Sequence, residues 1–407
     1  MKIQWPREFP GIHWLDAREE KAVLDVIRGK SPFRYYGVRK PKYVDALEAR
    51  ARRFYGAQYA LAVNSGTGAL MTAMQALGIG PGMEVILPCF FWTATVSAAV
   101  QANAIPVLCE VNDSFTMDPE DLQKKITPRT RLIVPVHMAG AVCDMQAVMR
   151  IARRHRIPVF EDCAQANGGE FQSRKIGTFG KLGMFSLQMN KNATAGEGGL
   201  LITNDSKLYT RCVSAHDVGL PWIGGAPCFA GPESMTWGGG RRMSELTGAV
   251  ASVQIQKLPR ILNRMRASKR RIKAALAGTP GLSFRRLNDE AGDTGCFLIL
   301  LLETPAAARL AAGRLQAQGI ASACRLADYG LHIYSNIPQL VNRTPLSPAG
   351  NPWNLPQNRA LVRDYQKGAC PQSDALFARS ISIPIPSCLT REEEKMAAQI
   401  IQQAVPD

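Results

Sequence analysis

A single lysine, Lys191, stands among small and polar residues in the segment 188–195. Residues 196–199 read Gly-Glu-Gly-Gly, and the apolar run 200–203, which is typical of a strand, follows them. A lysine amine can form a Schiff base when its surroundings lower its pKa. Because most lysines are merely solvated, this interpretation of Lys191 depends on support from other segments.

A turn of small residues, Ser65, Gly66 and Thr67, lies between the strand-like run 59–63 and a helical pattern at 68–77. The free N–H groups at a helix start and the helix dipole favour a bound phosphate, and the Thr67 hydroxyl can add a hydrogen bond. Ordinary turn formation is the commoner reason for such residues at a strand–helix junction. Taken alone, this segment indicates a phosphate site only weakly.

Aromatic and acidic residues follow two other strand-like runs. Trp92 comes after the run 84–88 and can stack on a flat ring, although adjacent aromatic residues usually belong to a core. Asp162 ends the run 158–162. In an open α/β sheet, ligands bind beyond the carboxyl ends of the strands, where an acid can pair with a protonated ring nitrogen. A helix N-cap by Asp162 is an equally good interpretation.

Short apolar runs alternate with helical patterns from residue 59 to about 205, which predicts a mainly parallel sheet covered by helices on both faces. The strand-like runs are 59–63, 84–88, 106–110, 130–136 and 158–162, and the helical patterns are 68–77, 94–101 and 145–155. Residues 204–240 look irregular, and the Pro- and Asn-rich residues 341–367 predict a long loop. Apolar runs at 294–302 and 379–384 predict a second, smaller α/β domain.

The composition is that of a globular protein, since 46% of the 407 residues are hydrophobic and 20% are charged. No run of 18 apolar residues occurs, and the first eight residues lack the apolar region of a secretory signal. We therefore expect a cytoplasmic protein without a membrane partner. The ten cysteines are scattered without a C-x-x-C pair, which favours free thiols and predicts no metal site.

The net charge of +16 has two interpretations. Lys and Arg can neutralise nucleic-acid phosphates, or a basic surface can attract an anionic small molecule. The densest basic run, 257–273, has apolar residues at helical spacing and predicts one amphipathic helix with a solvated basic face. No nucleic-acid motif accompanies this run, so we expect no nucleic-acid partner.

These segments together resemble the DegT/DnrJ/EryC1/StrS family, the sugar and cyclitol aminotransferases among the fold-type I enzymes of pyridoxal 5′-phosphate (PLP). The matching residues occur in the family's order at 64–67, 92–95, 135–137, 161–165, Ser186 with Lys191 and 196–199, 242–246, and 379–384. Each motif is modest alone, but the ordered set spans roughly residues 10–400. The order and spacing of the motifs make a chance resemblance unlikely.

The resemblance implies a role for each matching residue. Lys191 aligns with the lysine that holds PLP and then moves protons, and Asp162 with the acid that pairs with the pyridinium nitrogen. Trp92 aligns with the aromatic residue stacked on the ring, and Gln165 with a glutamine near the ring hydroxyl. The positions implied for the phosphate are Ser65, Gly66, Thr67 and Ser186.

The resemblance also implies a large domain, 1–255, with a mainly parallel seven-stranded sheet, and a small C-terminal α/β domain, 256–407. The N-terminal segment 1–35 can pack on the small domain. A homodimer with active sites at its interface is implied, and we expect a loop from about 215 to 242 to enter the partner's site. Further candidates for contacts with the substrate or the partner subunit are His216, Arg241, Arg242, His332 and Tyr334.

Two departures from the family pattern bear on the reaction. Gly240 stands where many members have an Asn that reaches the cofactor phosphate of the neighbouring subunit, and Asn167 stands at a usual His position. We expect an aminotransferase that moves an amino group from glutamate or glutamine to a keto sugar, keto-cyclitol or related carbonyl compound. The alternatives are a PLP-dependent elimination or cyclisation on the same scaffold, and a non-catalytic PLP-binding regulator.

Overall fold

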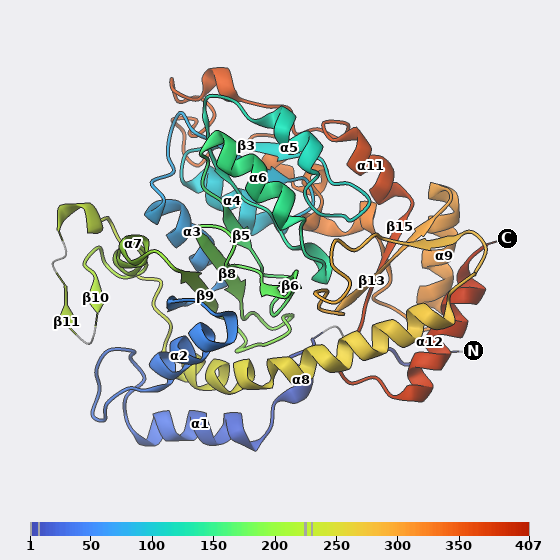
Figure 1. Ribbon diagram of the computed structural model, residues 1–407, viewed down its shortest axis with the longest axis horizontal. Helices are drawn as coiled ribbons and strands as arrows, with labels where there is room; N and C mark the ends of the chain where they lie inside the picture. Colours follow the sequence, from blue (N-terminus) through green and yellow to red (C-terminus); the bar gives the residue numbers. More distant parts are fainter. Residues whose placement is uncertain (1, 7–8, 224–225, 229–230, 407) are drawn as a thin grey trace.

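The computed structural model describes residues 2–6, 9–223, 226–228 and 231–406. Its central layer is built from two hydrogen-bonded sheets, β1-β9-β8-β5 and β3-β2-β4 (Figure 1). Parallel bridges from Ile133 to Val159 and from Val136 to Asp162 join β4 to β5. The strands are β1 (Tyr59–Val63), β2 (Glu84–Pro88), β3 (Ile105–Cys109), β4 (Thr130–Ile133), β5 (Phe160–Asp162), β8 (Leu182–Ser186) and β9 (Gly199–Thr203).

This layer confirms the predicted mainly parallel sheet of seven strands, in the order β1-β9-β8-β5-β4-β2-β3. The exception is β9, which runs antiparallel to both β1 and β8. All of β2, β3, β8 and β9 are buried along their whole length, as expected for strands covered on both faces. The carboxyl ends of β5 and β8 therefore open at the same edge of the sheet.

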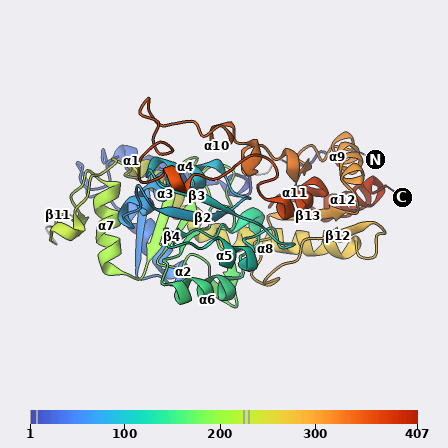
Figure 2. The ribbon, with the colours of Figure 1, turned by 90° about the horizontal axis from the view of Figure 1, so that it is seen from above.

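Helices cover both faces of this layer because successive strand side chains point to opposite sides. Leu61 and Val63 of β1 belong to a core with α3, α4 and α7, whereas Ala60 and Ala62 belong to a core with α2, α5, α6 and α8. Figure 2 shows α3 and α4 on one side of the strands and α2, α5 and α6 on the other. The helices are α2 (Tyr43–Tyr55), α3 (Gly66–Ala76), α4 (Thr93–Gln101), α5 (Pro119–Lys125), α6 (Met145–His155), α7 (Ser206–His216) and α8 (Glu245–Ala275).

A smaller antiparallel sheet, β12-β13-β15-β14, follows the long helix α8. Its core includes side chains of α9 (Pro305–Ala317), α12 (Arg391–Ala404) and the end of α8, together with Ile3 and Trp5. Its strands are β12 (Leu282–Phe284), β13 (Phe297–Leu302), β14 (Cys324–Arg325) and β15 (Ser380–Pro384). The expected boundary at residue 255 falls inside α8, and the division into two domains stays a prediction.

The remaining elements are short or peripheral. The helix α1 (Ala17–Arg28) packs on α8, as Figure 1 shows at the bottom of the view. The others are the hairpins β6 (Glu170–Phe171) with β7 (Arg174–Lys175) and β10 (Trp222–Ile223) with β11 (Ala226–Pro227), and the helices α10 (Pro338–Val341) and α11 (Pro371–Ala378). Within the described residues, no helix is both long and apolar enough to span a membrane.

Two expectations about local structure are wrong. Residues 206–216 are not irregular but form α7, which Asp205 caps by accepting a hydrogen bond from the Leu208 N–H at 3.0 Å. The basic residues of α8 are not all solvated, because Lys257 and Lys269 are buried. Nζ of Lys257 lies 2.6 Å from a carboxylate oxygen of Glu19, and Nζ of Lys269 lies 2.6 Å from one of Asp293. Part of the basic face is therefore neutralised inside the protein.

Candidate functional site

A cavity of about 380 Å³ opens at the carboxyl ends of β5 and β8. It is lined by seven of the eight predicted cofactor residues, namely Ser65, Gly66, Thr67, Trp92, Asp162, Ser186 and Lys191. A smaller cavity of about 120 Å³ adjoins it, and Ala164, Asn190, Lys191 and His332 line both. Gln165 lines the smaller cavity, so the structure brings all eight predicted cofactor residues to one place.

The start of α3 forms one wall of the larger cavity. Ser65 caps this helix by accepting a hydrogen bond from the Gly68 N–H at 2.9 Å. The first N–H groups of a helix have no acceptor within it, so those of Gly66 and Thr67 suit a phosphate. A Cβ atom at Gly66 would lie 2.9 Å from both Cβ and Oγ of Ser186. Glycine is therefore required for the helix start to lie this close to β8.

The two adjacent carboxylates at the end of β5 face opposite ways, as neighbouring residues of a strand must. Glu161 is completely buried, and its carboxylate accepts backbone hydrogen bonds from Gly177, Phe179 and Gly180, each at 2.7 Å. It thereby fixes the loop before β8. Of the pair, only Asp162 lines the cavity.

Asp162 is 3% exposed, and both of its carboxylate oxygens have a protein partner. One accepts from the Thr95 hydroxyl at 2.7 Å and the other from the Ala164 N–H at 3.0 Å. Burial raises the pKa of Asp162, although these two hydrogen bonds and the charge of Lys191 act in the opposite direction. No helix follows Asp162, so the N-cap interpretation is wrong. A cation beside this carboxylate would offset its loss of hydration.

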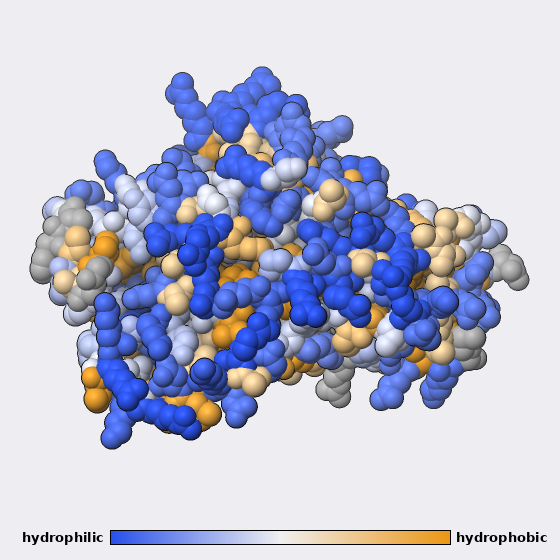
Figure 3. All heavy atoms as spheres, turned by 60° about the horizontal axis from the view of Figure 1, so that its bottom comes forward, coloured by the Kyte–Doolittle hydropathy of each residue, from blue (hydrophilic) through white to orange (hydrophobic). Residues whose placement is uncertain are grey.

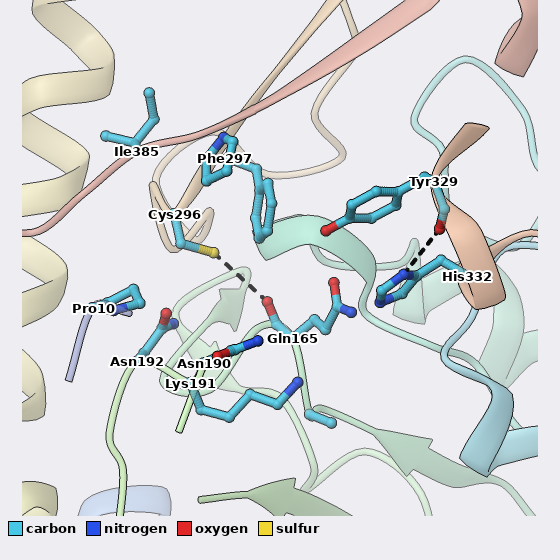
Figure 4. A pocket seen from close by; sticks show the side chains of 12 residues that line it. Pro10, Gln165, Asn190, Lys191, Asn192, Cys296, Phe297, Tyr329, His332 and Ile385 are labelled. Carbon is cyan, nitrogen blue, oxygen red and sulfur yellow. Dashed lines mark hydrogen bonds between the residues drawn. The ribbon is translucent and has the colours of Figure 1, made fainter. Parts of the chain in front are cut away.

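Lys191 lies between the two cavities on a tight turn after β8. Its backbone N–H donates to the Gln188 carbonyl at 3.0 Å, and its own carbonyl accepts from the Gly11 N–H at 3.1 Å. Figure 4 shows the side chain extended along the cavity floor, with its amine directed away from Asn192. The turn is therefore held from the N-terminal segment, whose Pro10 also lines the smaller cavity.

That N-terminal segment connects the lysine turn to the small sheet. The Trp5 indole N–H donates to the Pro384 carbonyl at 3.2 Å, and the Trp14 indole N–H donates to the Ser387 hydroxyl at 3.0 Å. Ser387 in turn donates to the Pro10 carbonyl at 2.7 Å. Residues close to both ends of the described chain thus meet beside the cavity.

Gln165 is oriented by the loop 138–140, whose residues Ala139 and Gly140 have positive φ angles of 50° and 79°. The Ala139 N–H donates to Oε1 of Gln165 at 3.3 Å, and the Gly140 N–H donates to its backbone carbonyl at 3.0 Å. The buried guanidinium of Arg285 donates to the carbonyls of Met138 and Ala139. This loop therefore sets the direction of the Gln165 amide.

Of the two candidates near residue 330, only His332 reaches the site. It lines both cavities, and its ring centre lies 4.7 Å from that of Trp92. Tyr334 is fully buried, its hydroxyl donates to Asp374 at 2.9 Å, and it lines neither cavity.

The three candidates near residues 216–242 line neither cavity in the described protein. His216 is fully buried, its Nδ1 lies 2.6 Å from the Val213 carbonyl, and burial lowers its pKa to about 3. Arg241 donates to Gln75 at 3.3 Å, and Arg242 forms an ion pair with Asp217. Whether these residues act on a partner subunit stays a prediction.

The structure adds site residues that the sequence reasoning did not select. Thr95 holds Asp162, and Gln188, Asn190, Glu197 and Tyr329 line one or both cavities. Helical spacing is a usable signal for Thr95, because it lies three residues after Trp92 at the start of α4. Tyr329 had no signal, since only the tertiary fold brings it to the site.

The two departures from the family pattern have different surroundings. Asn167 is 1% exposed, accepts a hydrogen bond from the Tyr55 hydroxyl and does not line either cavity. Gly240 has a φ of +62°, and a Cβ atom there would have nothing within 4 Å. The chain thus leaves room for a side chain at residue 240.

A sequence model of the DegT/DnrJ/EryC1/StrS aminotransferase family matches residues 16–334. The chain belongs to this family. A relative from Micromonospora echinospora, named L-glutamine:2-deoxy-scyllo-inosose aminotransferase, is 37% identical over 65% of this chain and 63% of its own length. GDP-perosamine synthase of Vibrio cholerae is 32% identical over 65% of this chain and 70% of its own length. The match spans less than two thirds of the length of the first curated relatives.

Solved structures also match over nearly the whole chain. 3-Amino-5-hydroxybenzoic acid synthase superposes with a TM-score of 0.80 at 25% identity, covering 99% of this chain and 98% of its own. DesV of S. venezuelae, solved with a ketimine intermediate, gives a TM-score of 0.77 at 26% identity, covering 95% of this chain and 94% of its own. The predicted fold class and family are thereby confirmed.

Proposed function

We propose that this chain is a PLP-dependent aminotransferase that transfers an amino group from glutamine or glutamate to a keto-cyclitol or related keto sugar. The observation that carries the proposal is the convergence of Lys191, the buried Asp162 and the start of α3 on one cavity. The names of several curated relatives, which are L-glutamine:2-deoxy-scyllo-inosose aminotransferases, support a cyclitol ketone as acceptor and glutamine as donor.

The residues present fit PLP in charge and shape. The N–H groups at the start of α3 and the hydroxyls of Thr67 and Ser186 suit its phosphate, and the close approach at Gly66 leaves that helix end open to the cavity. Asp162 offers a buried carboxylate to a cationic ring nitrogen. Trp92, which is 42% exposed, lines the cavity, and its indole can stack on a flat ring.

PLP, when bound, supplies a ring that accepts electrons from the substrate carbon. The carboxylate of Asp162 keeps a proton on the ring nitrogen, which maintains that electron demand. Nζ of Lys191 holds the cofactor at rest. When it is not bonded to the cofactor, Nζ would be the base that removes and returns a proton at the substrate carbon.

The test is direct labelling of the lysine. Purified protein with PLP should show a visible absorption band, and borohydride should then attach the cofactor to the peptide that contains Lys191. Lys191→Ala should lose both the label and glutamine-dependent amination. Lys181→Ala, which changes an exposed lysine, is the matched control and should keep both. Labelling of wild-type protein elsewhere, or none, would contradict the proposal.

Consumption of the amino donor separates transamination from the other PLP chemistries. An aminotransferase consumes one glutamine for each amino group it transfers, whereas an elimination or cyclisation of the substrate consumes none. Turnover of a keto-cyclitol without loss of glutamine would therefore favour the second reaction class. A protein that binds PLP but turns over neither substrate would favour a regulator.

We also propose that two copies of the chain associate through the end that carries β10 and β11. Figure 3 shows hydrophobic side chains gathered there. Tyr36, Val38, Val218 and Trp237 are exposed by 66%, 79%, 68% and 90%, which is unusual for large apolar side chains on a monomer. Sedimentation should give a dimer, and Trp237→Asp should shift it toward the monomer. If Trp237→Asp keeps the mass of the wild-type protein at all concentrations, this surface is not where the two copies associate.

A cytoplasmic location is part of the same proposal. None of the ten cysteines, all of which the structure describes, forms a disulfide, and seven of them are buried. Free thiols in this number suit a reducing compartment, where disulfides do not persist.

A further inference from the structure

His332 lies where the two cavities meet, and its ring contacts two aromatic side chains. The ring of Tyr329 stacks on it at 4.3 Å with an angle of 14°, and the ring of Trp92 lies 4.7 Å away at 48°. Its backbone carbonyl accepts a hydrogen bond from the Phe91 N–H at 3.0 Å. The imidazole therefore has little freedom to turn.

The partner of Nδ1 determines which nitrogen of His332 carries the hydrogen. Nδ1 lies 3.1 Å from the backbone carbonyl oxygen of Tyr329. A carbonyl only accepts hydrogen bonds, so Nδ1 must donate. Burial lowers the pKa of His332 to about 4, so the ring is neutral near pH 7. In the neutral ring Nε2 is then an acceptor.

Gln165 supplies a donor on the opposite side of the smaller cavity. Its Oε1 accepts from the Ala139 N–H, which turns the amide NH₂ group the other way. Figure 4 shows the Gln165 amide facing His332, with open space beside both. An acceptor and a donor thus face the same part of the cavity.

The charges of the smaller cavity limit what can bind between them. Among the residues that line it in the described chain, Lys191 alone has a formal charge at neutral pH. There is no carboxylate to pair with an ammonium group and no arginine to hold a carboxylate or phosphate. A hydroxyl both donates and accepts, whereas a carboxylate only accepts and an ammonium only donates.

We infer that His332 and Gln165 together bind one hydroxyl group of the keto substrate. The hydroxyl donates to Nε2 of His332 and accepts from the amide NH₂ of Gln165. The substrate class is thus a neutral, hydroxylated ring, and His332 is a specificity-determining residue. This inference rests on the proposed aminotransferase function, because it concerns the acceptor of that reaction.

The experiment compares 2-deoxy-scyllo-inosose with analogues that each have one hydroxyl replaced by hydrogen. His332→Phe keeps a ring between Tyr329 and Trp92 but removes the acceptor. It should raise the KM for the parent ketone by about 10- to 100-fold and change kcat much less. His332→Gln, which restores an acceptor, should recover part of the loss. Leu331→Ala changes the exposed neighbouring residue and should leave KM unchanged.

One analogue identifies the bound hydroxyl. For the analogue that lacks it, wild-type protein and His332→Phe should have the same KM, because the hydrogen bond is already absent. If His332→Phe raises KM equally for the parent and every analogue, or mainly lowers kcat, the inference is overturned. The wild-type half-reaction with glutamine alone tests the proposed function separately, since it does not involve the ketone.

Discussion

Replacing Asp162 by Asn should stabilise the protein without its cofactor while nearly abolishing its activity. Asn has the same shape, and its amide can serve both Thr95 and Ala164, because the Thr95 hydroxyl can also accept a hydrogen bond. The change removes a buried charge whose pKa burial raises. The pKa of Asp162 is higher in the folded protein than in the unfolded chain. This carboxyl therefore favours folding when the pH is below its pKa in the unfolded chain. That contribution is lost as pH rises through the folded pKa.

The free energy of unfolding at pH 8 should rise, because the two hydrogen bonds offset only part of the desolvation that raises the pKa of Asp162. The gain should shrink as pH falls through the folded-state pKa of Asp162. In the protein with bound PLP, Asp162 would pair with the cationic ring nitrogen. Removing one partner of a buried ion pair costs about 3–5 kcal/mol. Activity should therefore fall by about 10²- to 10⁴-fold.

The assay combines urea unfolding of the apoprotein at two pH values with the glutamine half-reaction. Glu161→Gln is the matched control, since the neighbouring carboxylate accepts three backbone hydrogen bonds and does not face the cavity. It should lower the free energy of unfolding by about 2–3 kcal/mol because at least one N–H then lacks an acceptor. If Asp162→Asn destabilises the apoprotein as much as this control, or keeps activity within tenfold, the reasoning is refuted.

Three further changes test other parts of the structure. Gly66→Ala should weaken PLP binding about tenfold in equilibrium dialysis, because overpacking against Ser186 costs about 1–3 kcal/mol. Adding Ser186→Gly to this variant should give partial recovery. Unchanged PLP binding by Gly66→Ala would contradict the close approach of Gly66 to Ser186. Glu19→Gln should lower the free energy of unfolding in urea by about 2 kcal/mol, because the buried Lys257 then keeps only the half-exposed Asp16 as its charge partner. Adding Lys257→Met should restore most of this, whereas no recovery would argue against an ion-pair origin. Gly240→Asn should lower the free energy of unfolding by less than about 1 kcal/mol, since the added Cβ meets nothing within 4 Å and Asn tolerates a positive φ. A larger loss of stability, measured by thermal unfolding, would contradict the open space at residue 240.

The elements that follow local rules were predicted closely. The strands at 59–63 and 84–88 and the helix at 145–155 have the bounds expected from their apolar patterns, because each buries a continuous or one-sided set of side chains. The helix at 206–216 was missed because the Gly- and Pro-rich residues after it dominated the interpretation. Its stability comes from tertiary burial of Leu208, Cys212 and Val213.

The site residues also divide into those that the sequence predicts and those that only the tertiary fold brings together. Residues next to a strand end, such as Asp162 and Lys191, were found because their position in the chain already implies their position at the sheet edge. Alternation along β5 also explains why Glu161 became a structural anchor and its neighbour a cavity residue. Tyr329 and Arg285 reach the site from distant segments, and only the packed tertiary structure brings them there.

The contacts of Trp5 and Trp14 with Pro384 and Ser387 have a consequence for biosynthesis. During translation, residues 5–14 leave the ribosome well before their partners, which emerge only after about 370 more residues have been made. Domains generally fold as units as they are synthesised. The large sheet can form early, whereas the turn that holds Lys191 receives its N-terminal support only when β15 arrives. Completion of the lysine site should therefore follow the formation of the large sheet during the folding of the nascent chain.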